Sequence, residues 1–281
     1  MEKRKKRKWI ILLCVAVLLM VLMVWTVWSN GAAKLSNITV TSGNLPKSFD
    51  GYKIALVSDL HNAEFGENNI ELIELLNKAS PNIIAITGDI VDSHRTDIEI
   101  AVEFARQAAE IAPCYYVSGN HEGLLDKGEY LRLITGLESV GVTVLDNEES
   151  IIERNGEKIS LIGINDPIIG ENHATSEKIA AIPSFDGFTI LLSHHPEIFD
   201  EYIGAGVDLA LCGHAHGGQF RLPFIGGLYA PNQGFFPKYD AGLYTSGNSN
   251  MVVSRGVGNS VYPIRFNNRP EIVLIELKSE I

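Results

Sequence analysis

Short apolar runs alternate with amphipathic stretches through the first half of the chain. The apolar runs are rich in β-branched residues and have the length of buried strands: Lys53–Ser58, Ile83–Thr87, Tyr115–Ser118 and Val142–Leu145. The stretches between them carry apolar residues at helical spacing: Asn68–Lys78, Asp97–Ile111 (with Asp97 as its N-cap) and Lys127–Ser139. Strands joined by helical crossovers run parallel, so this pattern predicts an α/β layered fold.

The second half of the chain has a different pattern. Ser150–Arg154 and Lys158–Ile164 flank Asn155-Gly156, a pair of residues that predicts a tight β-hairpin. Further strands are expected at Thr189–Ser193, Val207–Cys212 and Glu271–Leu277, with a helix near Pro196–Gly204. Residues 217–268 are rich in glycine, proline and aromatic residues. We expect loops and irregular strands there.

The N-terminus carries a long apolar segment. Residues 9–28 contain no charged residue, and at 1.5 Å per residue they are long enough to cross a bilayer core. Six basic residues precede them, and Trp9, Trp25 and Trp28 occupy the positions of interfacial aromatics. A retained anchor is favoured over a cleaved secretory signal, whose apolar region is usually shorter. In both cases the positive flank stays in the cytoplasm and the rest of the chain crosses the membrane.

These features predict a single-pass protein of the cell membrane with its N-terminus in the cytoplasm. We expect a basic cytoplasmic tail at residues 1–8, the anchor at 9–28, a linker and first strand at 29–46, and one extracytoplasmic domain at 47–281. Cys114 and Cys212 lie in or beside apolar runs, which favours buried free thiols, with a disulfide between them as the alternative.

Charge excludes one class of partner. The net charge is −11, and without residues 1–28 the chain keeps 17 basic and 33 acidic residues, a net charge of −16. Nucleic-acid binding without sequence preference depends on basic residues that neutralise phosphates, so we expect no nucleic-acid partner. No protein partner is predicted either.

Five short polar segments each follow an apolar strand. They are Ser58-Asp59-Leu60-His61, Gly88-Asp89-Ile90-Val91-Asp92, Gly119-Asn120-His121-Glu122, Ser193-His194-His195-Pro196 and Gly213-His214-Ala215-His216-Gly217-Gly218. The carboxyl ends of strands in an open α/β sheet converge on the ligand crevice. Carboxylates and imidazoles suit manganese, iron and zinc, and one aspartate can bridge two such cations. Each segment alone is a weak signal, but the five together predict a metal site.

The order DxH, GDxxD, GNHE, HxP and GHxH resembles the calcineurin-like metallophosphoesterase superfamily over residues 50–277. The GHAHGGQ segment, with Leu222-Pro223, Arg255-Gly256 and Pro263-Ile264-Arg265, is similar to a bacterial membrane-associated branch that includes UDP-diacylglucosamine hydrolase-like phosphodiesterases. This resemblance implies a four-layer α/β/β/α sandwich after the transmembrane helix. It also implies a hydrolase that cleaves a phosphodiester or pyrophosphate bond in a lipid, a nucleotide-linked lipid or a cell-wall polymer.

The resemblance also assigns roles to residues. It places one divalent cation (Mn, Zn or Fe) on Asp59, His61 and His216, a second on Asn120, His194 and His214, and Asp89 between them. His121 matches the family's general acid, and Asp92 matches the carboxylate that orients this histidine in some members. A hydroxide held between the cations would attack phosphorus while the imidazole protonates the departing oxygen.

Several alternatives stay open. Protein phosphatases of the superfamily carry an arginine and a glycine where this chain has Ser93 and Asn62, so phosphoprotein phosphatase activity is disfavoured. A phosphomonoesterase or a non-catalytic metal-binding sensor are the alternative functions. His195 competes with His194 as a ligand, although the HxP spacing favours His194.

Other residues have both a structural and a functional interpretation. His94 and His173 are expected to be solvated loop residues. Arg255 and Arg265 are candidates for contacts with substrate phosphate, since guanidinium groups bind phosphate in a bidentate manner. The apolar residues of segment 217–240 form either a small core beneath a loop or an apolar lip for a lipid substrate: Phe220, Leu222, Phe224, Tyr229, Phe235 and Phe236.

Overall fold

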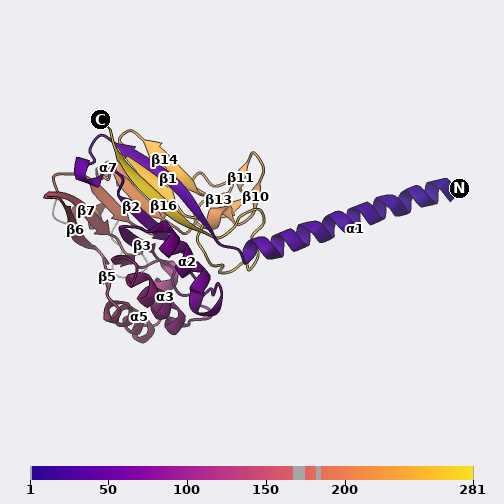
Figure 1. The fold of residues 1–281 in the computed structure, drawn as a ribbon, viewed down its shortest axis with the longest axis horizontal. Coiled ribbons are helices and arrows are strands. Elements are labelled where there is room, and N and C mark those ends of the chain that lie inside the picture. Colours follow the sequence, from indigo (N-terminus) through magenta and orange to yellow (C-terminus); the bar gives the residue numbers. More distant parts are fainter. Residues whose placement is uncertain (1, 167–174, 182–184, 281) are drawn as a thin grey trace.

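Two six-stranded sheets form the centre of the molecule, with helices on their outer faces (Figure 1). The computed structural model describes residues 2–166, 175–181 and 185–280. The first sheet has the order β1 (Lys34–Ser42), β16 (Glu271–Ser279), β2 (Lys53–Val57), β3 (Ile83–Thr87), β4 (Cys114–Val117) and β5 (Val142–Val144). β2 to β5 are parallel, whereas β16 runs antiparallel to β2 and parallel to β1.

The second sheet has the order β14 (Gly242–Ser246), β15 (Ser249–Val253), β9 (Leu209–Cys212), β8 (Thr189–Leu192), β7 (Glu157–Gly163) and β6 (Glu148–Arg154). Its four inner strands are parallel, and the two edge strands are antiparallel to their neighbours. Two short two-stranded sheets lie outside it: β10 (Arg221–Leu222) with β11 (Gly226–Gly227), and β12 (Tyr229–Ala230) with β13 (Gly234–Phe235).

The helices complete the layers. The first sheet is covered by α2 (Ile70–Ala79), α3 (Ile98–Ala109) and α5 (Lys127–Ser139), and the second by α6 (Thr175–Ala181) and α7 (Phe199–Gly204). The remaining helical elements are α1 (Glu2–Asn30), α4 (Asn120–Gly123) and four 3₁₀ turns: η1 (Lys47–Phe49), η2 (Glu67–Asn69), η3 (Pro196–Ile198) and η4 (His216–Gly218).

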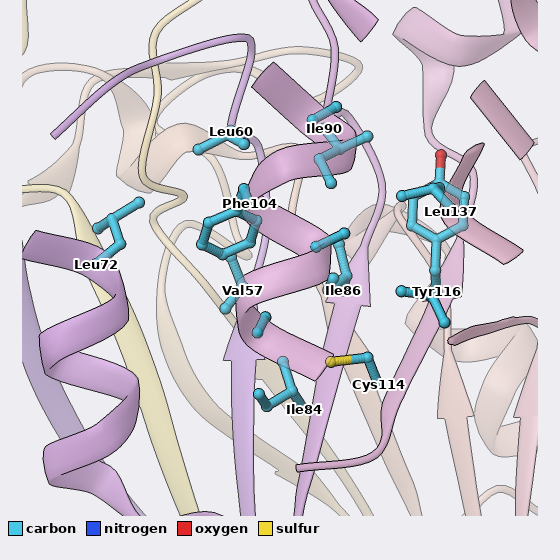
Figure 2. Close-up of a cluster of buried hydrophobic side chains, with 14 of the residues drawn as sticks. Val57, Leu60, Leu72, Ile84, Ile86, Ile90, Phe104, Cys114, Tyr116 and Leu137 are labelled. Carbon is cyan, nitrogen blue, oxygen red and sulfur yellow. The ribbon is translucent and has the colours of Figure 1, made fainter. Parts of the chain in front are cut away.

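Alternation of side chains along the strands creates the core on both sides of each sheet. In β2, Ile54 and Leu56 pack between the two sheets, whereas Ala55 and Val57 pack against the helices of the first sheet. Figure 2 shows that outer cluster, in which Phe104 of α3 lies against strand residues such as Val57. Residues buried on both faces explain why the strands appear in the sequence as continuous apolar runs. The predicted four-layer α/β/β/α sandwich is confirmed.

Local signals in the first half predict the elements well. Helix α5 has the predicted bounds, and the Asp97 side chain accepts a hydrogen bond from the backbone N–H of Ile100 at the start of α3. Asn155 and Gly156, with φ of 52° and 83°, form the tight turn between β6 and β7. Such a turn requires positive φ at both central residues, which asparagine and glycine tolerate.

The expectation of irregular strands throughout residues 217–268 is wrong for β14 and β15, which form a regular hairpin. β15 lies between β14 and β9, and all five of its residues are buried. The strand escaped detection because Ser249 and Asn250 are polar, which leaves too short an apolar run to predict a buried strand.

The cysteines are free thiols, as favoured by the sequence. Cys114 lies in the outer cluster of the first sheet and Cys212 in the outer cluster of the second. Both sheets therefore separate the two sulfur atoms, which excludes the alternative disulfide.

Candidate metal centre

The predicted ligands lie where strands of both sheets end. β2 is followed by Asp59 and His61, β3 by Asp89, β4 by Asn120, β8 by His194, and β9 by His214 and His216. Five of these residues have φ between 46° and 64°: Asp59, His61, Asp89, His214 and His216. Positive φ is energetically costly for residues with a side chain, and it is concentrated at functional sites in proteins.

Asp59, His61 and His216 form the first group, with ligand atoms within 4.8 Å of one another. Nε2 of His61 lies 3.3 Å from Nε2 of His216, and Oδ1 of Asp59 lies 3.9 Å and 3.6 Å from these two nitrogen atoms. Burial lowers the pKa of His61 to about 3 and also lowers the pKa of His216. Both imidazoles are therefore neutral at pH 7, which is the form that binds a metal ion.

Asp89, His194 and His214 form the second group. Nδ1 of His194 lies 2.8 Å from the carbonyl oxygen of Thr87. Because a carbonyl can only accept, Nδ1 carries a proton, and Nε2 lies 3.2 Å from Oδ2 of Asp89. Burial disfavours the charged imidazole, but the carboxylate of Asp89 outweighs it and raises the pKa of His194. Burial lowers the pKa of His214 to about 3. Asn120 adds a carbonyl oxygen next to this group, at the start of α4.

The two groups meet at Asp89. Its Oδ1 accepts a hydrogen bond of 2.8 Å from the backbone N–H of His121, while its Oδ2 lies 3.6 Å from Nε2 of His61 and 3.2 Å from Nε2 of His194. One carboxylate oxygen thus faces a histidine from each group. This is the position that a shared ligand of two cations requires.

The donor set fits divalent cations. Among the described residues, Nε2 of His194 and Oδ1 of Asn120 are buried and have no hydrogen-bond partner. Unpaired buried polar atoms are rare in folded proteins, because each costs about 1–3 kcal/mol. One cation would satisfy both of these lone pairs, and a second would be held by the facing Nε2 atoms of His61 and His216.

Two glycines permit the close approach of the motif loops. A Cβ atom at Gly119 would lie 2.4 Å from Oδ1 of Asp89, and one at Gly213 would lie 1.8 Å from Oγ of Ser58. Neither distance is possible for a real side chain. These positions require glycine because two loops touch at each of them: the loops after β3 and β4 within the first sheet at Gly119, and the loops after β2 and β9 of the two sheets at Gly213.

Glu122 connects two of the motif loops. Its buried carboxylate accepts hydrogen bonds from the backbone N–H groups of Gly119 (2.6 Å), Asp89 (2.8 Å) and Val91 (3.2 Å). Burial, together with the nearby charge of Asp89, raises the pKa of Glu122 to about 8, and the three N–H donors oppose this rise. Glu122 was predicted only as part of the GNHE motif, and its contacts with the backbone of the two loops were not predicted.

His121 lies beside the two groups. Its Nδ1 accepts a 3.0 Å hydrogen bond from the backbone N–H of Ser93, and its Nε2 lies 3.1 Å from Oγ of Ser260. Since the Ser93 N–H can only donate, neutral His121 carries its proton on Nε2. Oδ1 of Asp92 lies 4.0 Å from Nδ1, beyond hydrogen-bond distance. The direct contact to Nδ1 is thus made by Ser93, and the orienting role of Asp92 stays a prediction.

Comparison with known proteins identifies the family. Residues 52–218 match the family model described as calcineurin-like phosphoesterase. The metallophosphoesterase YkuE of Bacillus subtilis is 31% identical over 260 residues, which cover 86% of this chain and 84% of the relative. The chain belongs to the calcineurin-like phosphoesterase family. It is therefore a metal-dependent phosphoesterase.

Two further relatives of this metallophosphoesterase carry informative names. The phosphodiesterase YaeI of Escherichia coli is 30% identical, covering 80% of this chain and 82% of the relative. A "transmembrane protein with metallophosphoesterase domain" from Danio rerio is also 30% identical, covering 87% of this chain and 57% of the relative. The second of these names, together with the apolar helix α1, supports membrane anchoring.

The alternative histidines of the metallophosphoesterase have other partners. His195 contacts Asp166 through Nε2 and Glu197 through Nδ1 (2.8 Å). Burial disfavours the charged imidazole, but these carboxylates outweigh it and raise the pKa of His195. This pairing supports His194 as the ligand. The side chain of His94 is 71% exposed, as expected, and His173 lies outside the described residues.

The two predicted arginine contacts have different outcomes. Arg265 is fully buried, and its guanidinium donates to Oδ1 of Asn259 and to the carbonyl oxygens of Arg255 and Gly258. A substrate contact by Arg265 is not compatible with this burial, so that prediction is wrong. The Nε of Arg255 lies 3.5 Å from a carboxylate oxygen of Glu271. The side chain of Arg255 is 24% exposed, and its contact with substrate phosphate stays a prediction.

A pocket of about 420 Å³ opens over the metal-ligand groups. Its polar floor includes Asp89, Asn120 and His121, and its walls include Tyr229 and Tyr262. Ser260 and Tyr262 were not predicted, because they lie between the resemblance stretches Arg255-Gly256 and Pro263-Ile264-Arg265 and belong to neither. The pocket thus joins a charged floor to aromatic walls.

The aromatic residues near the pocket do not form a small core. Phe224, Phe235 and Phe236 are exposed, and Phe224 is fully so. Phe220 and Tyr229 are 36% and 40% exposed. The structure therefore rules out the small-core interpretation for the three phenylalanines.

Proposed function

We propose that this metallophosphoesterase hydrolyses a phosphodiester or pyrophosphate bond at a site for two divalent cations (Mn, Zn or Fe). In this proposal Asp59, His61 and His216 hold one cation, Asn120, His194 and His214 hold the other, and Asp89 is shared. The observation that carries the proposal is the position of Asp89 Oδ2, which faces His61 at 3.6 Å and His194 at 3.2 Å.

The cations, when bound, would activate water for attack and neutralise charge on the phosphoryl oxygens. The protein supplies the rest of the chemistry. The backbone N–H of Ser93 holds the ring of His121 and leaves its proton on Nε2. His121 lines the pocket, and in its imidazolium form it can give the Nε2 proton to the leaving oxygen of the ester, which returns the ring to its neutral form. His121 is then the general acid of the reaction.

The pocket favours a diester with an apolar portion. Aromatic residues such as Tyr229 and Tyr262 form walls above the polar floor, which suits an ester whose phosphate reaches the floor. The name of the phosphodiesterase relative is in keeping with this substrate class. A lipid, a nucleotide-linked lipid or a wall polymer has such a structure.

Hydrolysis assays test the proposal directly. The purified full chain is assayed with Mn²⁺ on bis(p-nitrophenyl) phosphate, on p-nitrophenyl phosphate and on membrane lipids. We expect the diester to be preferred. Asp89→Asn should abolish turnover and lower the metal content, while Asp186→Asn, an exposed carboxylate far from the motifs, should change neither. Two bound metals and normal turnover in Asp89→Asn would exclude Asp89 as the shared ligand.

The same assays separate the alternatives. A phosphomonoesterase would prefer the monoester, and a sensor module would bind metal with no turnover of any substrate. His121→Asn is expected to reduce turnover by roughly 10²–10⁴-fold at unchanged metal content. Loss of metal in this variant would instead make His121 a ligand.

We also propose that the catalytic domain lies on the outer side of the cell membrane. The six basic residues before Trp9 resist translocation, and α1 contains an apolar window long enough to span a bilayer. Protease added to intact spheroplasts should then digest the domain and leave a small membrane-bound fragment. A protected full-length protein would place the domain in the cytoplasm, whereas free protein that starts near Ala33 would indicate a cleaved signal.

A further inference from the structure

An exposed apolar surface lies beside the pocket. We call it the apolar rim, and each of its six residues is at least 51% exposed: Phe224, Ile225, Phe235, Phe236, Tyr262 and Ile264. They come from two segments that are far apart in the sequence. Large exposed apolar patches are uncommon on soluble monomers and mark surfaces that contact a partner or a membrane.

Hydrogen bonds hold the two segments of the apolar rim together. The side-chain amide of Gln219 donates to the carbonyl oxygens of Tyr262 and Ile264, both at 2.8 Å. The backbone N–H of Arg221 donates to the carbonyl oxygen of Phe266 at 2.9 Å. The rim is therefore one structured surface.

The end of helix α1 is attached to this same surface. The side chain of Asn30 donates to the carbonyl oxygen of Arg265 and accepts from its backbone N–H, both at 2.7 Å. Arg269 donates to the carbonyl oxygen of Ala32 at 2.9 Å and lies over the ring of Trp28, 5.0 Å from its centroid. Figure 1 shows α1 leaving the domain on the side of β10, β11 and β13.

This attachment determines the depth of the apolar rim relative to a bilayer that α1 spans. Trp28 is an interfacial aromatic, and Asn30 follows it by two residues, or about 3 Å along the helix axis. Asn30 is hydrogen-bonded to Arg265, which directly follows Ile264 of the rim. The rim thus begins at the boundary between headgroups and acyl chains, where apolar surface segments typically insert.

From this geometry we propose that the apolar rim inserts into the same leaflet from which α1 emerges. The domain then rests on the membrane as a fixed body. Tyr262 belongs both to the rim and to the pocket wall, so the pocket opens at the lipid surface. The substrate is accordingly a phosphate ester with its apolar part in the bilayer. This last step rests on the proposed function, whereas the insertion of the rim does not.

Fluorescence quenching tests the insertion without any enzyme assay. In a Cys14→Ala background, single cysteines replace Phe224 or Phe235 and carry an environment-sensitive fluorophore. Cys114 and Cys212 stay unlabelled because they are buried. The full chain is reconstituted in phosphatidylcholine and phosphatidylglycerol vesicles that contain lipids with nitroxide-labelled acyl chains. The matched control is Leu131→Cys, an exposed apolar position on α5.

We expect several-fold stronger quenching at positions 224 and 235 than at position 131. Equal, weak quenching at all three positions would overturn the proposal. Energy transfer between labelled copies that disappears on dilution in lipid, without quenching by nitroxide lipids, would overturn it too, because a second copy would then cover the rim.

Kinetics test the substrate class separately. The double variant Phe224→Ser/Ile225→Ser should raise KM for a vesicle-embedded phosphodiester several-fold and leave hydrolysis of soluble bis(p-nitrophenyl) phosphate unchanged, because neither residue lines the pocket. An equal effect on both substrates would exclude a role of the rim in substrate capture. If the wild-type protein hydrolyses neither substrate, the proposed function fails, while the quenching result still decides the insertion.

Discussion

Replacement of Glu122 probes how the metal-ligand loops are held. Its carboxylate accepts three backbone hydrogen bonds, from Gly119, Asp89 and Val91, and its side chain is 1% exposed. Glu122→Ala removes all three acceptor contacts. Each buried N–H without a partner costs about 1–3 kcal/mol, and water that enters the vacated space offsets part of this cost. We expect the free energy of unfolding to fall by about 3–6 kcal/mol.

Glu122→Gln is the milder change. The amide keeps one oxygen that can accept from Gly119 and Asp89, but its NH₂ group faces the N–H of Val91. One unpaired donor should cost about 1–3 kcal/mol. For a protein of this size 1 kcal/mol corresponds to about 2–4 °C in Tm, so Tm should fall by about 2–12 °C for glutamine and by more for alanine.

Thermal unfolding followed by circular dichroism measures both effects, and elemental analysis measures the accompanying loss of metal. Glu138→Gln is the matched control, because Glu138 is exposed on α5. Its Tm should equal that of the wild type. If Glu122→Ala unfolds like the wild type and keeps its metal, the backbone contacts of Glu122 do not hold the loops, and the reasoning is wrong.

Three further predictions follow from the site and the core. Ser93→Ala should leave turnover nearly unchanged, because the backbone N–H still holds His121. A clear loss of turnover in Asp92→Asn would show that this carboxylate acts on His121 despite the 4.0 Å between its Oδ1 and Nδ1 of the ring. The pH–rate profiles of both variants measure these effects. Burial raises the pKa of Cys114 to about 12 and also raises the pKa of Cys212, so both thiols should stay protonated and react with thiol reagents at pH 8 only after unfolding. Chelation of divalent cations should lower Tm by about 5–10 °C, reversibly with Mn²⁺, because a ligand at 100-fold its Kd stabilises by about 2.7 kcal/mol.

Much of the fold was predictable because the relevant signals are local. Strands β2 and β3 of the first sheet are buried on both faces, so they form continuous apolar runs, and the bounds of β3 and α5 match the prediction. The motif residues follow these strands directly. Their convergence at one edge of the sheets follows from parallel pairing, a general property of this architecture.

Other features depend on contacts that a sequence does not display. The hydrogen bond to His121 comes from the backbone of Ser93, and backbone donors have no residue signature. Arg265 looked like a phosphate contact because its type suits phosphate, yet its neighbours in the fold are carbonyl oxygens that bury it. The polar residues of β15 concealed a strand that only pairing with β9 explains.

Strand β16 sets the order in which the molecule can be assembled. It follows β15 in the sequence, yet it lies between β1 and β2 and pairs with both, for example Ser36 with Val273. While the ribosome is still adding the final residues, β1 has no partner and β2 is the edge of an incomplete sheet. The first sheet therefore cannot be completed until β16 has been synthesised, because β16 provides the pairing for β1 and for the free edge of β2. A premature stop before Glu271 would leave β1 without the strand that ties it into the first sheet, so quality-control proteases should recognise such a product at the membrane.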